Sequence, residues 1–257
     1  MATAPVWALL CHDGAMSGLV EVFHTRTLRL VEGALPSLLP EERTEMDRRW
    51  DEAVQRQPAF FDGPTVASLG VEHEGDALVL HWARCSYRYR ALRQVVGATW
   101  LPAPVFVTVL QPTPEGSLIV GRSADWTAVP GRWSFPGGSA EPPGVGAPFG
   151  EQGLREHAAR ELGEETGIEV LPDDLGLFAV SRGKHASIGV HFLAPQLPEE
   201  LVREHHAGLR DAETARGREG ELDVLSTVGS EAEALALGCV ADYLPPLVAR
   251  YTSPATR

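Results

Sequence analysis

The sequence of 257 residues lacks long apolar runs and is poor in cysteine. No stretch approaches the roughly 18 apolar residues of a membrane span, and the apolar stretch 6–11 is too short and lacks the basic flank of a signal peptide. Cys11, Cys85 and Cys239 are odd in number and form no CxxC pair, so we interpret them as small core residues rather than a disulfide framework or a zinc site. We therefore expect a cytoplasmic protein with no membrane partner.

Positive charge is also scarce. The chain has 22 Lys and Arg residues against 35 Asp and Glu residues, a formal net charge of -13. Because such a surface repels polyphosphate backbones, a nucleic acid partner is disfavoured. An anionic ligand would need local cations or a divalent metal held by acidic side chains.

The pattern of apolar and polar residues predicts two parts, residues 1–96 and residues 97–257. Residues 1–96 predict a small α+β extension, with alternating segments at Gly18–Val31 and Asp76–Arg84. Between them, a helix is expected to begin near Pro40 and to end before Pro58. Gly97 and two nearby prolines indicate the boundary.

Residues 97–257 alternate strand and helix patterns, which predicts an α/β fold without internal repeats. The expected strands are Val105–Leu110, Leu118–Gly121, Leu177–Ser181, Ile188–Leu193 and Leu222–Val228. The expected helices are Gly150–Thr166, Glu199–His206, Glu231–Leu237 and Val240–Tyr251, and the expected loops are Pro142–Gly150 and Ala207–Gly220.

Three carboxylates, Glu161, Glu164 and Glu165, are spaced so that a helix places them on one face. Like charges this close destabilise a bare helix, so a counter-cation is expected, and oxygen ligands suit Mg²⁺ or Mn²⁺. Upstream, Gly137 and Gly138 end the segment 131–138, where glycines permit a close approach of the backbone to a ligand.

Together, residues 131–138 and 160–168 resemble the signature of the Nudix superfamily. The resemblance implies a Nudix α/β/α sandwich carrying the small N-terminal α+β extension. The sequence departs from the family pattern at the first glutamate of the signature, which is called the Nudix box. Gln152 stands eight residues before Arg160, with Glu151 beside it, so the box contains an insertion. Either residue, or neither, takes that position.

A narrower resemblance is to the Nudix hydrolases that cleave UDP-glucose and UDP-galactose to UMP and a sugar 1-phosphate, which also have a long N-terminal extension and an interrupted box. The shared features are short and scattered: Trp50, Gln57-Pro58, Phe61-Asp62, Ser86-Tyr87-Arg88, Phe135-Pro136-Gly137-Gly138 and Glu141-Pro142. This resemblance implies a nucleoside diphosphate sugar as substrate.

The superfamily resemblance also implies roles for individual residues. Glu161, Glu164 and Glu165 become metal ligands together with a backbone carbonyl of Gly138 or Gly137. Arg160 is expected to orient a metal-binding carboxylate, or else to form a surface pair with Glu164.

The same resemblance implies a glutamate as general base, on a loop after the strands that follow the box. Glu219 is the first candidate there, and Glu221 lies in the same loop. A box glutamate, Glu164, is the alternative.

Candidate substrate-binding residues are the cations and one aromatic side chain near the expected site. They are Arg122, Arg182, Lys184, His185, Tyr87 and Arg88.

These observations favour a pyrophosphatase that depends on Mg²⁺ or Mn²⁺ and acts on a small-molecule nucleotide, with UDP-glucose as the first candidate. A different nucleoside diphosphate derivative, such as ADP-ribose or a coenzyme A species, is the alternative substrate. A non-catalytic nucleotide-binding module of the same fold is the alternative from another class. The resemblance also makes a homodimer possible.

Overall fold

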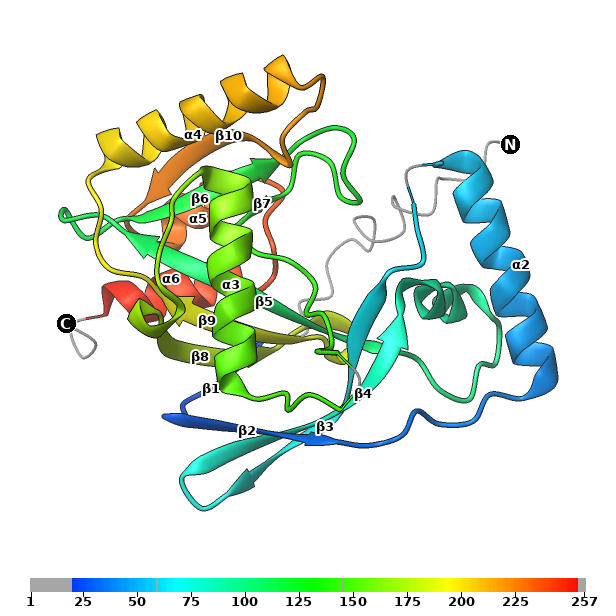
Figure 1. Ribbon diagram of the computed structural model, residues 1–257. Helices are drawn as coiled ribbons and strands as arrows, with labels where there is room; N and C mark the ends of the chain where they lie inside the picture. The colour runs from blue at the N-terminus through cyan, green and yellow to red at the C-terminus, as the bar shows by residue number, and fades with distance from the viewer. Residues whose placement is uncertain (1–19, 59, 145, 254–257) are drawn as a thin grey trace.

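The computed structural model describes residues 20–58, 60–144 and 146–253, which build one mixed β-sheet flanked by helices (Figure 1). The main path of the sheet runs β1-β8-β9-β5-β3-β4-β2. Its strands are β1 (Glu21–Phe23), β8 (Gly176–Arg182), β9 (Ile188–Leu193), β5 (Ala103–Pro112), β3 (Pro64–Glu74), β4 (Ala77–Ser86) and β2 (Thr27–Glu32). Off this path, β6 (Leu118–Ser123) pairs with β5, β7 (Trp133–Ser134) and β10 (Leu222–Val228).

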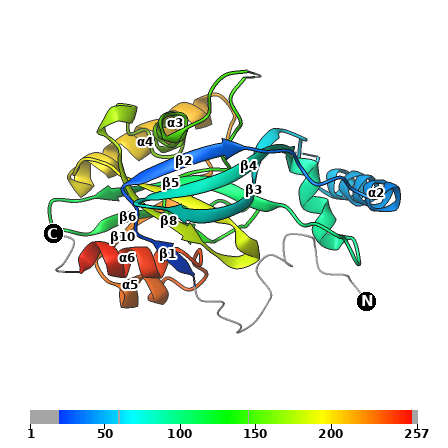
Figure 2. The same ribbon diagram turned by 90° about the horizontal axis from the view of Figure 1, so that it is seen from below.

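Helices cover both faces of the sheet, which confirms the predicted α/β class (Figure 2). On one face lie α3 (Glu151–Thr166) and α4 (Glu199–Ala215), and on the other lie α5 (Glu231–Ala236) and α6 (Leu244–Thr252). Short 3₁₀ helices are η1 (Tyr87–Gln94), η2 (Pro172–Asp174) and η3 (Lys184–Ala186).

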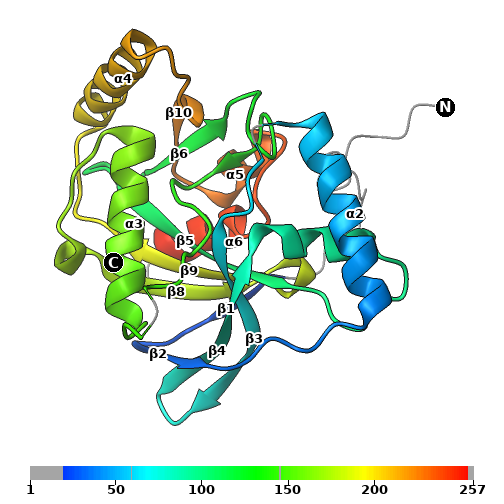
Figure 3. The same ribbon diagram turned by 45° about the vertical axis from the view of Figure 1, so that its right-hand side comes forward.

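The N-terminal extension continues the sheet of the following part. Ala67 and Ser68 of β3 pair with the start of β5, and β1 pairs with β8 at the opposite end of the path. Helix α2 (Pro40–Arg56) lies beyond the sheet, well apart from α3 and α4 (Figures 1 and 3). Its Met46 and Trp50 form a small buried core with Ala91 and Leu92 of η1. The domain boundary at residues 96 and 97 stays a prediction.

Helix α3 is oriented by its apolar side chains. Leu154, Ala158 and Leu162 recur every four residues, and all three are fully buried against the sheet. This spacing is that of one helix face, so their burial sets the rotation of the helix about its axis. Gly167 ends the helix in the left-handed conformation (φ 75°), where a Cβ would lie 2.7 Å from the carbonyl oxygen of His205.

The expected helices and strands are present, with differences in extent. The segment Ala207–Gly220 was expected to be a loop, but α4 continues to Ala215 because its alanine, leucine, arginine and glutamate residues outweigh the cost of Gly208. Strand β3 was not predicted. The expectation of core cysteines is wrong for Cys239, which is exposed, while Cys85 is half-buried and Cys11 lies outside the described residues.

Within the described ranges, every helix is too short or too polar to cross a bilayer.

Candidate active site

The final turns of α3 bring a buried carboxylate to the Gly137–Gly138 segment. Glu165 is only 8% exposed, and its Oε2 accepts a hydrogen bond from the backbone N–H of Gly137 at 2.8 Å. Burial raises the pKa of Glu165 well above its ordinary value, and the charges of Glu161, Glu221 and Glu164 raise it further, against the opposing effect of the Gly137 bond. At neutral pH this cluster therefore needs a cation or a proton.

Two glycines allow the backbone to pass between β5 and α3. Gly137 has φ 151°, and a Cβ there would lie 2.1 Å from the carbonyl oxygen of Val107. A Cβ on Gly138 would lie 2.5 Å from Oε1 of Glu161. Any side chain at either position would therefore push the segment away from β5 or from the Glu161 carboxylate.

The oxygen groups at this point suit a hard divalent cation. Glu161 and Glu165 contact consecutive residues of the same backbone segment, which brings carboxylates and peptide carbonyls together. Across the described ranges, no group of three or more His, Cys, Asp or Glu side chains is placed to hold a metal by itself. The donor set therefore fits Mg²⁺ or Mn²⁺ only with a backbone carbonyl and water as further ligands. The carbonyl of Gly138 accepts the N–H of Val107 at 3.0 Å, so one of its two lone pairs is already used in pairing with β5.

Arg160 does not contact a metal-ligand candidate. Its Nη2 lies 3.6 Å from Oε2 of Glu141 and donates to Nδ1 of His157. His157 is buried, and its Nε2 lies 3.0 Å from Oε1 of Glu161. The side chain that borders Glu161 is thus His157, which sequence reasoning missed although it stands one helical turn before Glu161.

The loop before β10 brings Glu221 close to the glutamates of α3. Partial removal from water raises the pKa of Glu221, and the charges of Glu161 and Glu164 add to the shift. The loop is held at its base, where the N–H of Ala124 donates to the Glu221 carbonyl at 2.8 Å. Glu221 thus lies within electrostatic reach of Glu161 and Glu164, and this placement favours it as the base candidate, while Glu219 stays a prediction.

Four of the proposed substrate-binding residues lie outside the extension: one on β6, one on β8 and two in the turn between β8 and β9. Arg122 forms a two-pronged pair with Asp223 across β6 and β10, at 2.8 and 3.1 Å. Arg182 pairs with Glu21 of β1. Lys184 and His185 lie in η3, where the N–H of Lys184 donates to Oδ2 of Asp242 at 2.8 Å.

The two candidates from the extension belong to η1. Arg88 forms ion pairs with Asp47 at 3.1 Å and Asp62 at 3.2 Å, which hold its guanidinium toward α2. The ring of Tyr87 packs edge-on against Trp50 at a centroid distance of 6.1 Å. These contacts make both residues part of the fold of the extension, and their role in substrate binding stays a prediction.

Glu151 and Gln152, the two candidates for the first glutamate of the box, make different contacts. Oε2 of Glu151 accepts the N–H of Leu28 in β2 at 3.2 Å, and its other oxygen binds Arg155. Gln152 is exposed and reaches Asp173. Of the two adjacent residues, Glu151 therefore ties α3 to the extension.

Comparison with known proteins places this site in a family. Residues 101–224 match the family model described as NUDIX domain. No curated protein matches the chain significantly.

Several solved structures are similar over part of the chain. The MutT protein from Methanosarcina mazei Go1 is 20% identical over 60% of this chain and 96% of its own, with a TM-score of 0.41. A MutT/nudix family protein from Enterococcus faecalis is 12% identical over 50% of this chain and 44% of its own, with a TM-score of 0.31. The Nudix hydrolase RenU from M. smegmatis is 15% identical over 56% of this chain and 80% of its own, with a TM-score of 0.32.

The match to the family model covers β5 to the start of β10, and thus the Gly137–Gly138 segment and all the glutamates of the site. Residues 101–224 are therefore similar to the Nudix domain family, and this match supports a Nudix hydrolase enzyme.

Proposed function

We propose that this Nudix hydrolase is a divalent-metal-dependent pyrophosphatase that hydrolyses a nucleoside diphosphate sugar, with UDP-glucose to UMP and glucose 1-phosphate as the first candidate reaction. One observation carries the metal-dependent chemistry: a buried carboxylate, Glu165, accepts a hydrogen bond from the Gly137 N–H and is repelled by the charges of nearby glutamates. A bound cation stabilises such a cluster at neutral pH by compensating the repulsion between its carboxylates.

Different residues of the site would have different roles in the reaction. A bound Mg²⁺ or Mn²⁺ would neutralise charge that develops on the diphosphate. Glu161 and Glu165, with Glu164, would hold the metal, and a carbonyl of Gly137 or Gly138 would add a ligand. Arg160 would act indirectly, because its guanidinium lies near Glu141 and donates to His157, which borders Glu161.

Glu221 is the base that the geometry favours. Partial burial and the nearby charges of Glu161 and Glu164 raise the pKa of Glu221, which makes its carboxylate a stronger proton acceptor. It would accept a proton from the attacking water as the oxygen of that water bonds to phosphorus and the phosphoanhydride P–O bond breaks. The products would be a nucleoside monophosphate and a sugar 1-phosphate. Glu219 and Glu164 are the alternative bases.

The choice of a UDP-sugar rests on the extension. The short segments shared with UDP-sugar hydrolases pack α2 against η1, as in the contact of Trp50 with Tyr87. This packing places η1 beside Ser139, next to the catalytic glycines. ADP-ribose or a coenzyme A derivative is the alternative substrate. A non-catalytic binding module is disfavoured because Glu161, Glu164 and Glu165 are all present. A homodimer and a cytoplasmic location stay predictions from the sequence.

A substrate panel tests the proposal. Phosphate-coupled hydrolysis of UDP-glucose, UDP-galactose, ADP-ribose, coenzyme A and nucleoside triphosphates would be measured with Mg²⁺, with Mn²⁺ and with chelator. We expect UDP-sugars to be cleaved fastest, and Glu165→Gln to lose about a hundredfold or more in kcat, equivalent to roughly 2.7 kcal/mol.

The matched control is Glu156→Gln, the same change on an exposed position of the same helix, which should retain wild-type activity. Preference for another substrate would refute the UDP-sugar assignment alone. Full activity of Glu165→Gln, or activity in chelator, would refute the metal-dependent site.

A further inference from the structure

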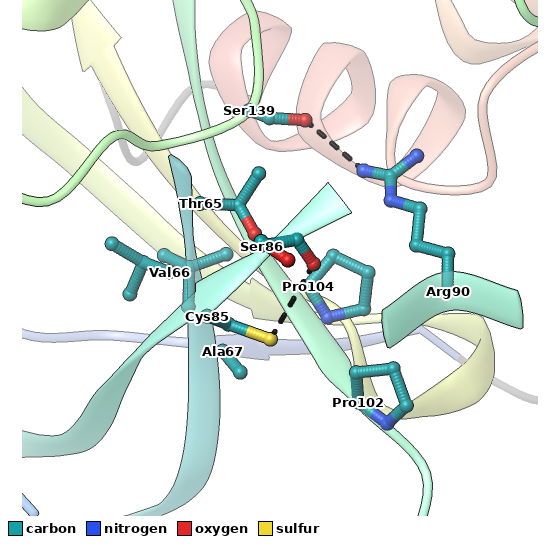
Figure 4. Close-up of a pocket in the computed structure, with 10 residues that line it drawn as sticks. Thr65, Val66, Ala67, Cys85, Ser86, Arg90, Pro102, Pro104 and Ser139 are labelled. Carbon is teal, nitrogen blue, oxygen red and sulfur yellow. Dashed lines mark hydrogen bonds between the residues drawn. The ribbon is translucent and has the colours of Figure 1, made fainter. Parts of the chain in front are cut away.

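A small cavity lies at the seam where the extension meets the Nudix domain. Its volume is about 10 Å³, and it is bordered by β3 and the end of β4 on one side and by the start of β5 on the other. Figure 4 shows Arg90 of η1 reaching across this space to Ser139, with Thr65 and Ser86 below. The cavity is thus bounded by both parts of the chain.

Arg90 has only neutral partners. Its Nη1 donates to the hydroxyl of Tyr87 at 3.1 Å and its Nη2 donates to Oγ of Ser139 at 3.0 Å. Its guanidinium also lies 4.2 Å from the centre of the Tyr87 ring. Within the described residues no carboxylate pairs with Arg90, whereas Arg88, two positions earlier on the same turn, pairs with two.

A second arginine strengthens the positive charge at the seam. Arg93 donates to the carbonyl of Pro102, which also borders the cavity. Burial lowers the pKa of Arg93, and the charge of Arg90 lowers it further. In a chain of net charge -13, two neighbouring half-buried arginines that lack an acidic partner in the described structure favour the binding of an anion.

The position of Arg90 relates this charge to the catalytic centre. Ser139, its partner, directly follows Gly138, and a Cβ on Gly138 would touch the Glu161 carboxylate. The arginine is also held rigidly, because the next two residues, Ala91 and Leu92, are buried in the core between η1 and α2. An anion bound to Arg90 would therefore lie beside the metal-ligand candidates.

We propose that Arg90 is a substrate-binding residue supplied by the extension, whose guanidinium holds a phosphate oxygen of the nucleoside diphosphate substrate while Tyr87 orients it. This inference rests on the proposed function for the identity of the ligand. Of the five N–H groups of the guanidinium, two donate to Tyr87 and Ser139, so further donors of the same planar group are available for phosphate.

The test compares Arg90→Ala and Arg90→Lys with Arg56→Ala. Arg56 is an exposed arginine of α2 paired with Glu52, so its removal changes the net charge of the extension equally. Steady-state kinetics on UDP-glucose, calorimetric binding of UDP with Mg²⁺, and thermal unfolding would be measured for each variant.

We expect Arg90→Ala to raise KM and the Kd for UDP by about tenfold to a hundredfold, the range for a charge-assisted hydrogen bond. Its kcat at saturation and its Tm should stay near the wild-type values, and Arg90→Lys should lie between the two. Arg56→Ala should behave as the wild type.

The outcomes separate this inference from the proposed function. If the wild type cleaves nothing on the panel but binds UDP or ADP, and Arg90→Ala weakens that binding tenfold, the subsite stands and the proposed function fails. If Arg90→Ala loses kcat and Tm together with unchanged Kd, Arg90 only braces the seam and the inference is overturned. Unchanged KM and Kd for Arg90→Ala would also overturn it, as would a larger loss of UDP affinity in Arg88→Ala than in Arg90→Ala. A wild type that binds neither UDP nor ADP would overturn both proposals.

Discussion

Replacing Gly137 with alanine should disrupt the active site more than the same change at any other glycine that the structure describes. Gly137 has φ 151°, a conformation that residues with a Cβ rarely adopt, and its Cβ would lie 2.1 Å from the carbonyl oxygen of Val107 and 2.7 Å from Cα of Thr108. Both neighbours are backbone atoms of the buried strand β5, so they cannot rotate away. The substitution must therefore displace the segment itself.

The cost of this displacement has two parts. Forcing alanine into such a backbone conformation costs about 1–3 kcal/mol. Displacement also breaks the 2.8 Å bond from the Gly137 N–H to Glu165 and leaves a buried carboxylate unpaired, which adds about 1–3 kcal/mol. We expect Gly137→Ala to lose roughly 2–6 kcal/mol of unfolding free energy, a large share of the ~5–15 kcal/mol of a typical protein.

Urea unfolding followed by circular dichroism measures this loss, and hydrolysis of the best substrate measures its effect on the site. We expect kcat/KM to fall at least about a hundredfold. The control is Gly144→Ala, where a Cβ meets no atom within 4 Å, and which should change stability by less than about 0.5 kcal/mol. A Gly137→Ala protein with stability within about 1 kcal/mol of the wild type and full activity would refute the reasoning.

Three further predictions follow from buried polar groups. Burial raises the pKa of Glu165, so the folded state is stabilised by its protonated form below about pH 4.5 and loses that stabilisation as pH rises through the raised pKa. In chelator, Glu165→Gln should therefore be more stable than the wild type at pH 8 but not at pH 4.5, as measured by urea unfolding. Burial lowers the pKa of His191 to about 3, so stability should fall, by up to roughly 5 kcal/mol, as pH drops from about 6.5 toward 3. His191→Phe should abolish that acid dependence and cost about 2–6 kcal/mol at pH 7, since it leaves two buried hydroxyls unpaired. Glu151→Ala should lower the unfolding free energy by about 1–3 kcal/mol because it leaves the backbone N–H of β2 without its acceptor, whereas Gln152→Ala should be nearly neutral in the same urea assay.

Local patterns explain why the centre of the site could be predicted. The spacing of Glu161, Glu164 and Glu165 on a helix needs only the period of the helix, and α3 spans Glu151–Thr166 against an expected 150–166. The role of the paired glycines could likewise be predicted, because few residues other than glycine permit such a close approach of the backbone. What the sequence could not show is that Gly138 offers its carbonyl to β5, since that depends on a strand pairing about 30 residues away.

The contacts of single arginines could not be predicted. Arg88 and Arg90 lie two residues apart in the same short turn, and only the direction of that turn relative to α2 decides that Arg88 meets Asp47 and Asp62 while Arg90 meets Ser139. Charge pattern alone favours neither residue. The same reason explains Arg122, whose partner Asp223 is 101 positions away in the chain and becomes adjacent only through pairing of β6 with β10.

Opposite charges face each other across the segment that contains Gly137, Gly138 and Ser139. On the α3 side burial and nearby carboxylates raise the pKa of Glu165, and on the η1 side burial and the charge of Arg90 lower the pKa of Arg93. Each side is therefore destabilised by burial of charge and by like charges. A cation on the first side and an anion on the second would relieve both. A diphosphate carrying a divalent metal supplies that pair of charges in one ligand. Because β3 pairs with β5 and η1 rests on α2, the two charged sides are held in place by one continuous sheet before any ligand arrives. If Arg90 binds substrate as proposed, the extension forms one wall of the active site.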